Sequence, residues 1–201
     1  HMVLLASTAD ANPNVAEVAA DYFVNRGQEK DAAKYKAAMK DCKSWQAKTR
    51  LAEAANKNTT SMFSSVKTAL QNEILASLNA AKNPYEKAAW LKAWASELRN
   101  FESIPKYTQP DQSIQVRTQA VTSLIDACRD KNFDAYFAGE GYLIKSQIGG
   151  YLVNAMKSGD AGIIALIAGA ITDPKTGMKE IFKERRTELN KALAGLKLPN
   201  E

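Results

Sequence analysis

Apolar residues recur at steps of three and four along nearly the whole chain, whereas the alternation of apolar and polar residues that marks strands is almost absent. This periodicity predicts an all-α fold, an irregular bundle of seven or eight helices. The 201 residues suffice for one domain or two small ones whose core needs no disulfide or metal. We predict one helical domain over residues 1–201, with a subdivision near residues 104–113, where Pro105 and Pro110 interrupt the pattern.

Capping residues predict where two helices begin. Asn12-Pro13 places a cap and a first-turn proline at the start of the first helix, and Gly27 ends it. Asn83-Pro84 gives the same signal for the fourth helix. The apolar residues that share one face of the first helix are Val15, Val18, Ala19, Tyr22 and Phe23.

Three other segments shape the predicted bundle. One long helix is expected over about residues 29–56. The segment 161–172 carries no charged residue, so we expect an enclosed, central helix in which Gly162 and Gly169 allow close packing. Between these segments, Gly139, Gly141 and the pair Gly149-Gly150 are expected to break the helix over residues 133–157 into pieces.

Several kinds of chemistry are excluded by the residues the chain lacks. His1 is its only histidine, and His1-Met2 is typical of residues left by a cleaved expression tag, so histidine-dependent catalysis and imidazole metal sites are excluded. Cys42 and Cys128 have no CxxC spacing, and we interpret them as free thiols, with a single disulfide as the alternative. No phosphate-binding loop is present, so no cofactor is expected, and the lack of a D-x-D or E-x-x-H spacing means that no metal is expected. No apolar run reaches the ~18 to 20 residues of a transmembrane segment.

The net charge of +5 is unevenly distributed along the sequence. Residues 26–57 hold nine basic and four acidic residues, and residues 175–197 hold seven basic and three acidic residues. Two rows of basic residues stand out, one in the second helix and one in the last helix. The rows are Lys36, Lys40, Lys43 and Arg50, and Lys175, Lys179, Lys183 and Arg186. If the two helices pack side by side, the rows merge into an anion-binding patch.

Three functional hypotheses follow from these patterns. The leading one is a non-enzymatic helical domain that binds or scaffolds a protein partner, with a composition similar to that of helical modules in larger bacterial proteins, including secreted effectors. The first alternative is binding of an anionic lipid, such as a phosphoinositide, or of a membrane surface through the basic rows. Nucleic acid is less favoured, because no aromatic residues are interleaved with the lysines. The second alternative is a carboxylate-dependent enzyme centred on Glu140, which two glycines flank, with Asp134 as a possible second acid.

Overall fold

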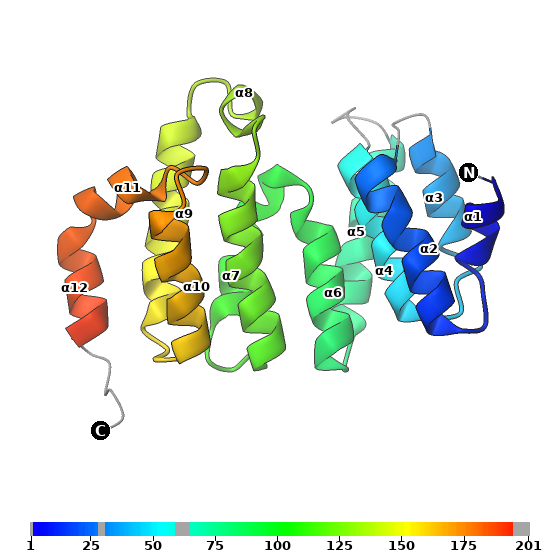
Figure 1. Cartoon of the computed structure of the whole chain (residues 1–201), viewed down its shortest axis with the longest axis horizontal. Coiled ribbons are helices and arrows are strands. Elements are labelled where there is room, and N and C mark those ends of the chain that lie inside the picture. The colour runs from blue at the N-terminus through cyan, green and yellow to red at the C-terminus, as the bar shows by residue number, and fades with distance from the viewer. Residues whose placement is uncertain (1, 28–30, 59–64, 195–201) are drawn as a thin grey trace. The chain divides into compact units, whose positions relative to one another are not determined.

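The computed structural model describes residues 2–27, 31–58 and 65–194 (Figure 1). All regular secondary structure in these ranges is helical, so the predicted all-α class is confirmed. The internal contacts divide the chain into two units, His1–Glu97 (unit 1) and Leu98–Glu201 (unit 2). The described residues form twelve α-helical segments, more than the predicted seven or eight, because several predicted helices are divided by short turns.

Unit 1 is organised around α4, which packs against α2, α3, α5 and α6. Eight of the fourteen residues of α4 are buried, and they include a glutamate and an asparagine. The helices described in unit 1 are α1 (Met2–Ser7), α2 (Pro13–Arg26), α3 (Ala32–Ala38), α4 (Trp45–Asn58), α5 (Ser65–Ala80) and α6 (Pro84–Ala95).

The predicted start signals of α2 and α6 are confirmed. The Asn12 side chain accepts a hydrogen bond from the Asn14 amide, and the Asn83 side chain accepts one from the Tyr85 amide. In both helices the proline follows directly, where its missing N–H costs no hydrogen bond. At these two positions the short polar cap and the proline locate the helix start, whereas Asp173-Pro174 is followed by a turn and α11 begins only at Met178.

The face that α2 buries differs from the face suggested by its apolar residues. Ala19 and Phe23 are buried as expected, whereas Val15 is 45% exposed and Val18 is 73% exposed. The buried side of α2 also contains Ala16, and α4, against which α2 packs, buries mainly alanines. Small side chains let two helices approach closely, so the alanine face lies inside and the valines lie outside.

The prediction of one long helix over residues 29–56 is wrong. The helix α3 ends at Ala38, a turn follows, and α4 begins at Trp45. Ser44 causes this new start, because its side-chain oxygen accepts a hydrogen bond from the Ala47 amide at 3.4 Å and so caps α4. The predicted start near residue 29 lies outside the described residues.

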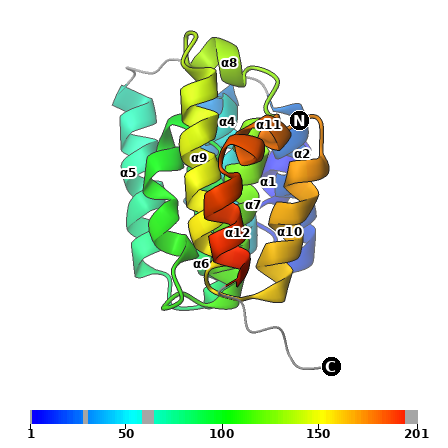
Figure 2. The same ribbon diagram turned by 90° about the vertical axis from the view of Figure 1, so that its left-hand side faces the viewer.

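Unit 2 is organised around α9, which packs against α7, α8, α10, α11 and α12 (Figure 2). Its core joins aliphatic residues of α7, α9 and α10 to the aromatic residues of the segments around them. The described elements are η2 (Leu98–Ser103) and η3 (Pro105–Thr108), which are 3-10 helices, and α7 (Ile114–Arg129), α8 (Phe133–Tyr136), α9 (Gly141–Met156), α10 (Ala161–Thr172), α11 (Met178–Glu184) and α12 (Arg186–Ala194).

Gly149 and Gly150 do not interrupt α9, contrary to the prediction. A Cβ atom on Gly149 would lie 2.5 Å from Ile181 Cγ2, and one on Gly150 would lie 3.4 Å from the guanidinium carbon of Arg185. The two glycines therefore allow α11 and the following turn to lie close against α9. The predicted break at Gly139 is confirmed, because its φ of +92° separates α8 from α9, which begins at Gly141.

The helix α10 has the predicted bounds, Ala161–Thr172, yet only one of its faces is enclosed. Ile163, Ile167 and Ala170 are buried against the neighbouring helices α7, α9 and α11. The residues on the opposite side are exposed, and none of them carries a charge. We call this side the outer face of α10; its residues are Ala161, Gly162, Ala165, Leu166, Ala168, Gly169 and Thr172.

Candidate functional site

The first predicted basic row does not lie along one helix. Lys36 belongs to α3, Lys40 and Lys43 belong to the turn that follows, and Arg50 belongs to α4. The cap at Ser44 breaks the helical register that would have aligned these side chains. The predicted stripe is therefore absent from unit 1 as the structure describes it.

Arg50 is held in an ion-pair network inside unit 1. Its guanidinium lies 3.1 Å from Asp21 Oδ1, 3.9 Å from Glu17 Oε1 and 3.1 Å from Glu53 Oε2. Glu53 is buried and also lies 3.5 Å from Lys92 Nζ on α6. These pairs tie α2, α4 and α6 together, so the charge of Arg50 is compensated by carboxylates of the same unit.

The second basic row is exposed along its whole length. Lys175 lies in the turn after α10, Lys179 and Lys183 lie on α11, and Arg186 begins α12. Lys183 Nζ is 3.8 Å from Glu180, whereas the described residues place no carboxylate within 4 Å of the other three. The last predicted helix is divided at Arg185, so this row spans two helices and a turn. The two basic rows belong to different units.

Glu140 precedes α9 and is exposed. Asp134, the predicted second acid, is 77% exposed in its side chain, and its Oδ1 lies 3.7 Å from Lys145 Nζ. A general acid or base needs a carboxylate that a cleft separates from solvent. The exposure of both carboxylates gives the enzymatic hypothesis no geometric support.

The two thiols are free, as interpreted from their spacing. Cys128 is buried in α7, and burial raises the pKa of its thiol to about 12. Partial burial also raises the pKa of the Cys42 thiol. Since the thiolate is the reactive form, neither cysteine is activated as a nucleophile at neutral pH.

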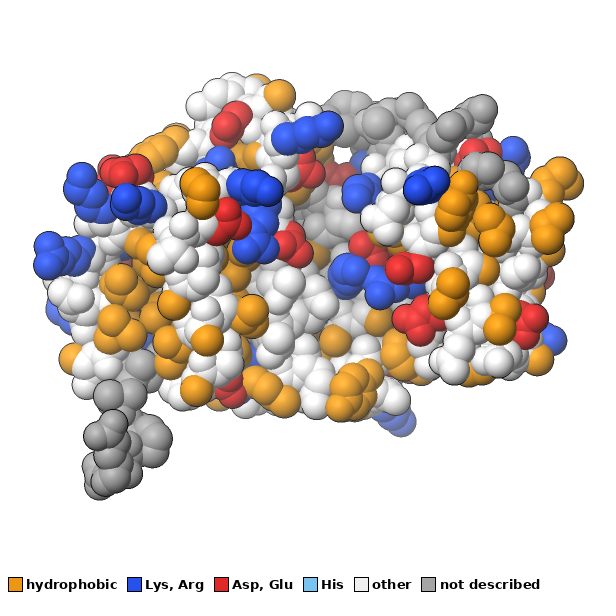
Figure 3. Space-filling view, in the orientation of Figure 1, with side chains coloured by type: hydrophobic (Ala, Val, Ile, Leu, Met, Phe, Trp, Pro, Cys, Tyr) orange, Lys and Arg blue, Asp and Glu red, His pale blue; other side chains and the backbone are white. Residues whose placement is uncertain are grey.

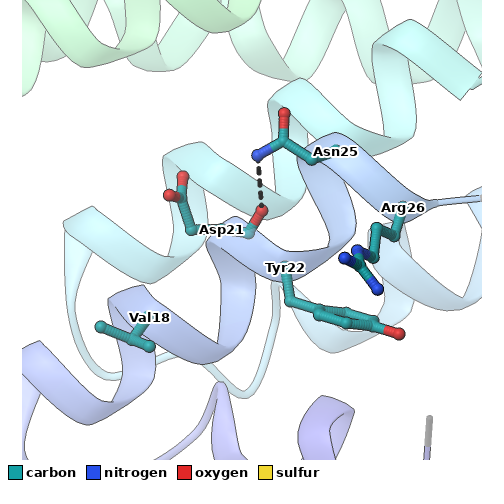
Figure 4. Close-up of a pocket in the computed structure, with 5 residues that line it drawn as sticks. All are labelled: Val18, Asp21, Tyr22, Asn25 and Arg26. Atoms are coloured by element: carbon teal, nitrogen blue, oxygen red, sulfur yellow. Dashed lines mark hydrogen bonds between the residues drawn. The ribbon is translucent and has the colours of Figure 1, made fainter.

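The outer face of α2 is a surface that sequence reasoning placed with the buried residues. Val18 and Tyr22 line a shallow pocket there together with Asp21, Asn25 and Arg26 (Figure 4). The Arg26 guanidinium carbon lies 5.8 Å from the centre of the Tyr22 ring, and Asn25 Nδ2 donates a 3.5 Å hydrogen bond to the Asp21 carbonyl. Apolar and charged side chains alternate around this pocket, and all of them belong to one helix.

The outer face of α10 is the other surface that the sequence analysis missed. It was expected to be enclosed, because a helix without charged residues is ordinarily buried. Figure 3 shows uncharged and hydrophobic atoms over most of α10, with lysine and arginine side chains gathered over α11. A sequence signal for this exposure exists, since alanine and glycine occupy one side of the segment and isoleucine the other.

The described residues contain no cluster of three or more potential metal ligands. None of the helices in these ranges is long and apolar enough to cross a membrane, which agrees with the sequence prediction. Comparison with protein-family models, with curated proteins and with solved structures found no match to this chain. The function is therefore inferred from two outer helix faces, one on α2 and one on α10, and from the exposed basic row of unit 2.

Proposed function

We propose that this chain is a helical protein-binding domain and that the outer face of α10 is its docking surface. The observation that carries the proposal is the exposure of this face, which lacks any charged residue over twelve helical residues. Leu166, near its middle, is 37% exposed. Exposed apolar surface that is continuous along an element marks interaction sites on folded proteins.

The outer face of α2 supports the proposal less strongly. Its apolar residues are larger, but Asp21 and Arg26 lie among them, and both have partners within unit 1. The outer face of α10 carries no charged side chain, so among the described residues it forms no ion pair or cation–π contact of this kind. A protein that covers this face would give α10 the enclosed environment that its composition requires.

Affinity capture with single-residue variants tests the proposal. The purified chain, its Leu166→Glu variant and a control variant, Val66→Glu at an exposed position of α5, are used as baits in an extract of the organism that encodes the chain. We expect a protein that the wild type and the control retain and that Leu166→Glu loses, because the new carboxylate must be desolvated at the interface. The same dependence is required when the purified partner is mixed with each bait. Equal retention by all three baits, or none above an empty resin, contradicts the proposal.

A second candidate function is binding to an anionic lipid surface through Lys175, Lys179, Lys183 and Arg186. The observation that favours it is that all four side chains are exposed within one short stretch of unit 2. Basic residues near an anionic membrane contribute about 1 kcal/mol each. Replacement of all four by glutamate should abolish sedimentation with phosphatidylserine vesicles, and sedimentation that is unchanged by this replacement contradicts the lipid hypothesis.

A further inference from the structure

We propose that the partner of α10 is an amphipathic helix whose apolar stripe is bordered by acidic side chains. This inference rests on the proposed function, in which the outer face of α10 docks a protein. Two features of unit 2 lead to it: the shape of the uncharged face and the sign of the charge beside it.

The shape of the face favours a helix laid close against α10. At about 100° per residue, Gly162, Ala165, Leu166 and Gly169 lie within about 100° of one another. A Cβ atom on Gly169 would meet nothing within 4 Å, and one on Gly162 would meet only Asp160 Oδ1, at 3.3 Å. The described chain therefore gives no packing reason for Gly169, although glycine weakens a helix interior, whereas a side chain at Gly162 would crowd the Asp160 oxygen that caps α10. An external helix that approaches the backbone of α10 supplies such a reason.

A lipid surface fits this face less well than a helix does. Helices that lie in the membrane interface insert tryptophan, phenylalanine or leucine, and Leu166 is the single side chain of that class on the outer face. Alanine and glycine offer little apolar area to acyl chains. They do allow close contact with another helix, where packing distance depends on side-chain size.

A second copy of this chain fits the face poorly as well. A helix of twelve residues is about 18 Å long and about 10 Å across, so the face covers roughly 200 to 400 Å². Stable dimers bury about 800 Å² on each partner. Two-fold pairing through α10 would also bring the basic residues beside it toward their equivalents in the other copy.

The basic residues near the outer face of α10 indicate that the partner carries acidic side chains beside its apolar stripe. Lys175 lies in the turn after α10, separated from the helix by Asp173 and Pro174, and Lys179 lies on α11, which packs against α10. The acid nearest to Lys175 in sequence, Asp173, is already paired with Arg129 Nε at 2.8 Å, and Glu180, which follows Lys179, lies 3.8 Å from Lys183 Nζ. Lys175 and Lys179 have no carboxylate within 4 Å in the described residues, so acidic side chains of a partner would meet unpaired ammonium groups.

Binding of two designed peptides to the full chain tests the inference by fluorescence anisotropy. Both peptides are amphipathic helices of about five turns with the same leucine stripe. One peptide carries glutamates beside the stripe, and the other carries lysines at the same positions. We expect the glutamate peptide to bind at least about tenfold more tightly at low salt, with a difference that shrinks as salt screens the charges.

Variants of the chain locate the bound peptide. Gly169→Leu and Leu166→Glu should weaken binding of the glutamate peptide by about tenfold or more, whereas the matched surface variant Val66→Glu, at an exposed position of α5 outside both faces, should leave it within about twofold. The double replacement Lys175→Glu and Lys179→Glu should reverse the preference between the two peptides. This reversal depends on the sign of the charges at positions 175 and 179, so a general loss of stability cannot produce it.

Each other outcome overturns the inference in a recognisable way. If both peptides bind equally and Gly169→Leu weakens both, the outer face of α10 is still the docking surface, but the inference that the partner carries acidic side chains is wrong. If neither peptide binds and the chain sediments with vesicles of phosphatidylcholine and phosphatidylserine, a membrane replaces the helix as the partner. If neither binds and light scattering shows a dimer that Leu166→Glu dissociates, the occupant is a second copy. Binding to none of these overturns the inference about the partner, and the proposed function is then decided by the affinity capture alone.

Discussion

The two units differ in whether charged residues are buried in their cores. The buried charged residues of the described chain, Asp31, Glu53, Lys67 and Glu97, all belong to unit 1. The buried polar residues of unit 2 are Thr108, Ser123 and Thr176, which carry no charge. Unit 1 thus encloses ion pairs within its core, whereas unit 2 has an apolar core and an uncharged helix face on its surface. The contrast shows that Arg50 and Lys67 hold the helices of unit 1 together, whereas the basic row of unit 2 remains at the surface, although Arg185 packs there against Gly150 and Arg129 pairs with Asp173.

The polar core of unit 1 links three helices. Asn56 Nδ2, on α4, donates hydrogen bonds to the Ala93 carbonyl and to Ser96 Oγ, both at 3.0 Å. Gln71, on α5, donates a hydrogen bond to Asn56 Oδ1. Lys67, also on α5, forms an ion pair with Glu97, which follows α6. A network of this kind fixes how the helices are aligned, because a shifted packing leaves its members unpaired.

The largest expected effect comes from breaking the buried ion pair of unit 1. Lys67→Met removes the cation next to Glu97, whose side chain is only 10% exposed. We expect this to lower the free energy of unfolding by about 3 to 5 kcal/mol, because a buried charge loses its counter-ion. Trp45, Trp90 and Trp94 all lie in unit 1, so urea unfolding followed by tryptophan fluorescence measures the change there.

The control for this prediction removes both partners. Lys67→Met combined with Glu97→Leu replaces the ion pair by apolar side chains, and we expect it to recover most of the lost stability. A single variant that costs less than about 1 kcal/mol would show that the pair is accessible to water. In that case the contrast between the two units would rest on Asp31 and Glu53.

A smaller effect is expected from the buried threonine that joins α10 to α11. Thr176 Oγ1 lies 2.7 Å from the Ala170 carbonyl and accepts a hydrogen bond from the Met178 amide at 3.0 Å. Thr176→Val leaves both buried groups without this partner, so we expect a loss of about 1 to 3 kcal/mol, measured by circular dichroism during urea unfolding. Thr172→Val, at the exposed end of α10, is the matched control and should cost less than about 0.5 kcal/mol. Equal costs would refute the role assigned to Thr176.

The sequence predicted the helical class and the capped starts of α2 and α6, since these depend on local chemistry. It failed where two local signals compete. The apolar stripe over residues 29–56 continues through the turn before Trp45, and the cap at Ser44 was the signal that decided the break.

The candidate site was predictable only in part. The basic residues beside α10 were found from charge counting, and the structure places them at the surface. The outer face itself was missed, because hydrophobicity does not reveal which helix lies at the edge of a unit. That position depends on which elements cover α10, and α7, α9 and α11 all lie on its isoleucine side.

The smallest predicted effect comes from a comparison of two glycines of unit 2, one on its surface and one in its interior. Gly169→Ala adds a methyl group in open space, so we expect the helix to gain about 0.5 to 1 kcal/mol in thermal or urea unfolding. The same substitution at Gly149 places a Cβ atom 2.5 Å from Ile181 Cγ2, and we expect it to cost about 1 to 3 kcal/mol. Stabilisation at Gly169 means that its glycine has no role in the folding of the free chain, which leaves the approach of a partner as its reason. If Gly169→Ala destabilises the chain as Gly149→Ala does, the glycine serves the internal packing of α10, and the outer face loses its strongest argument.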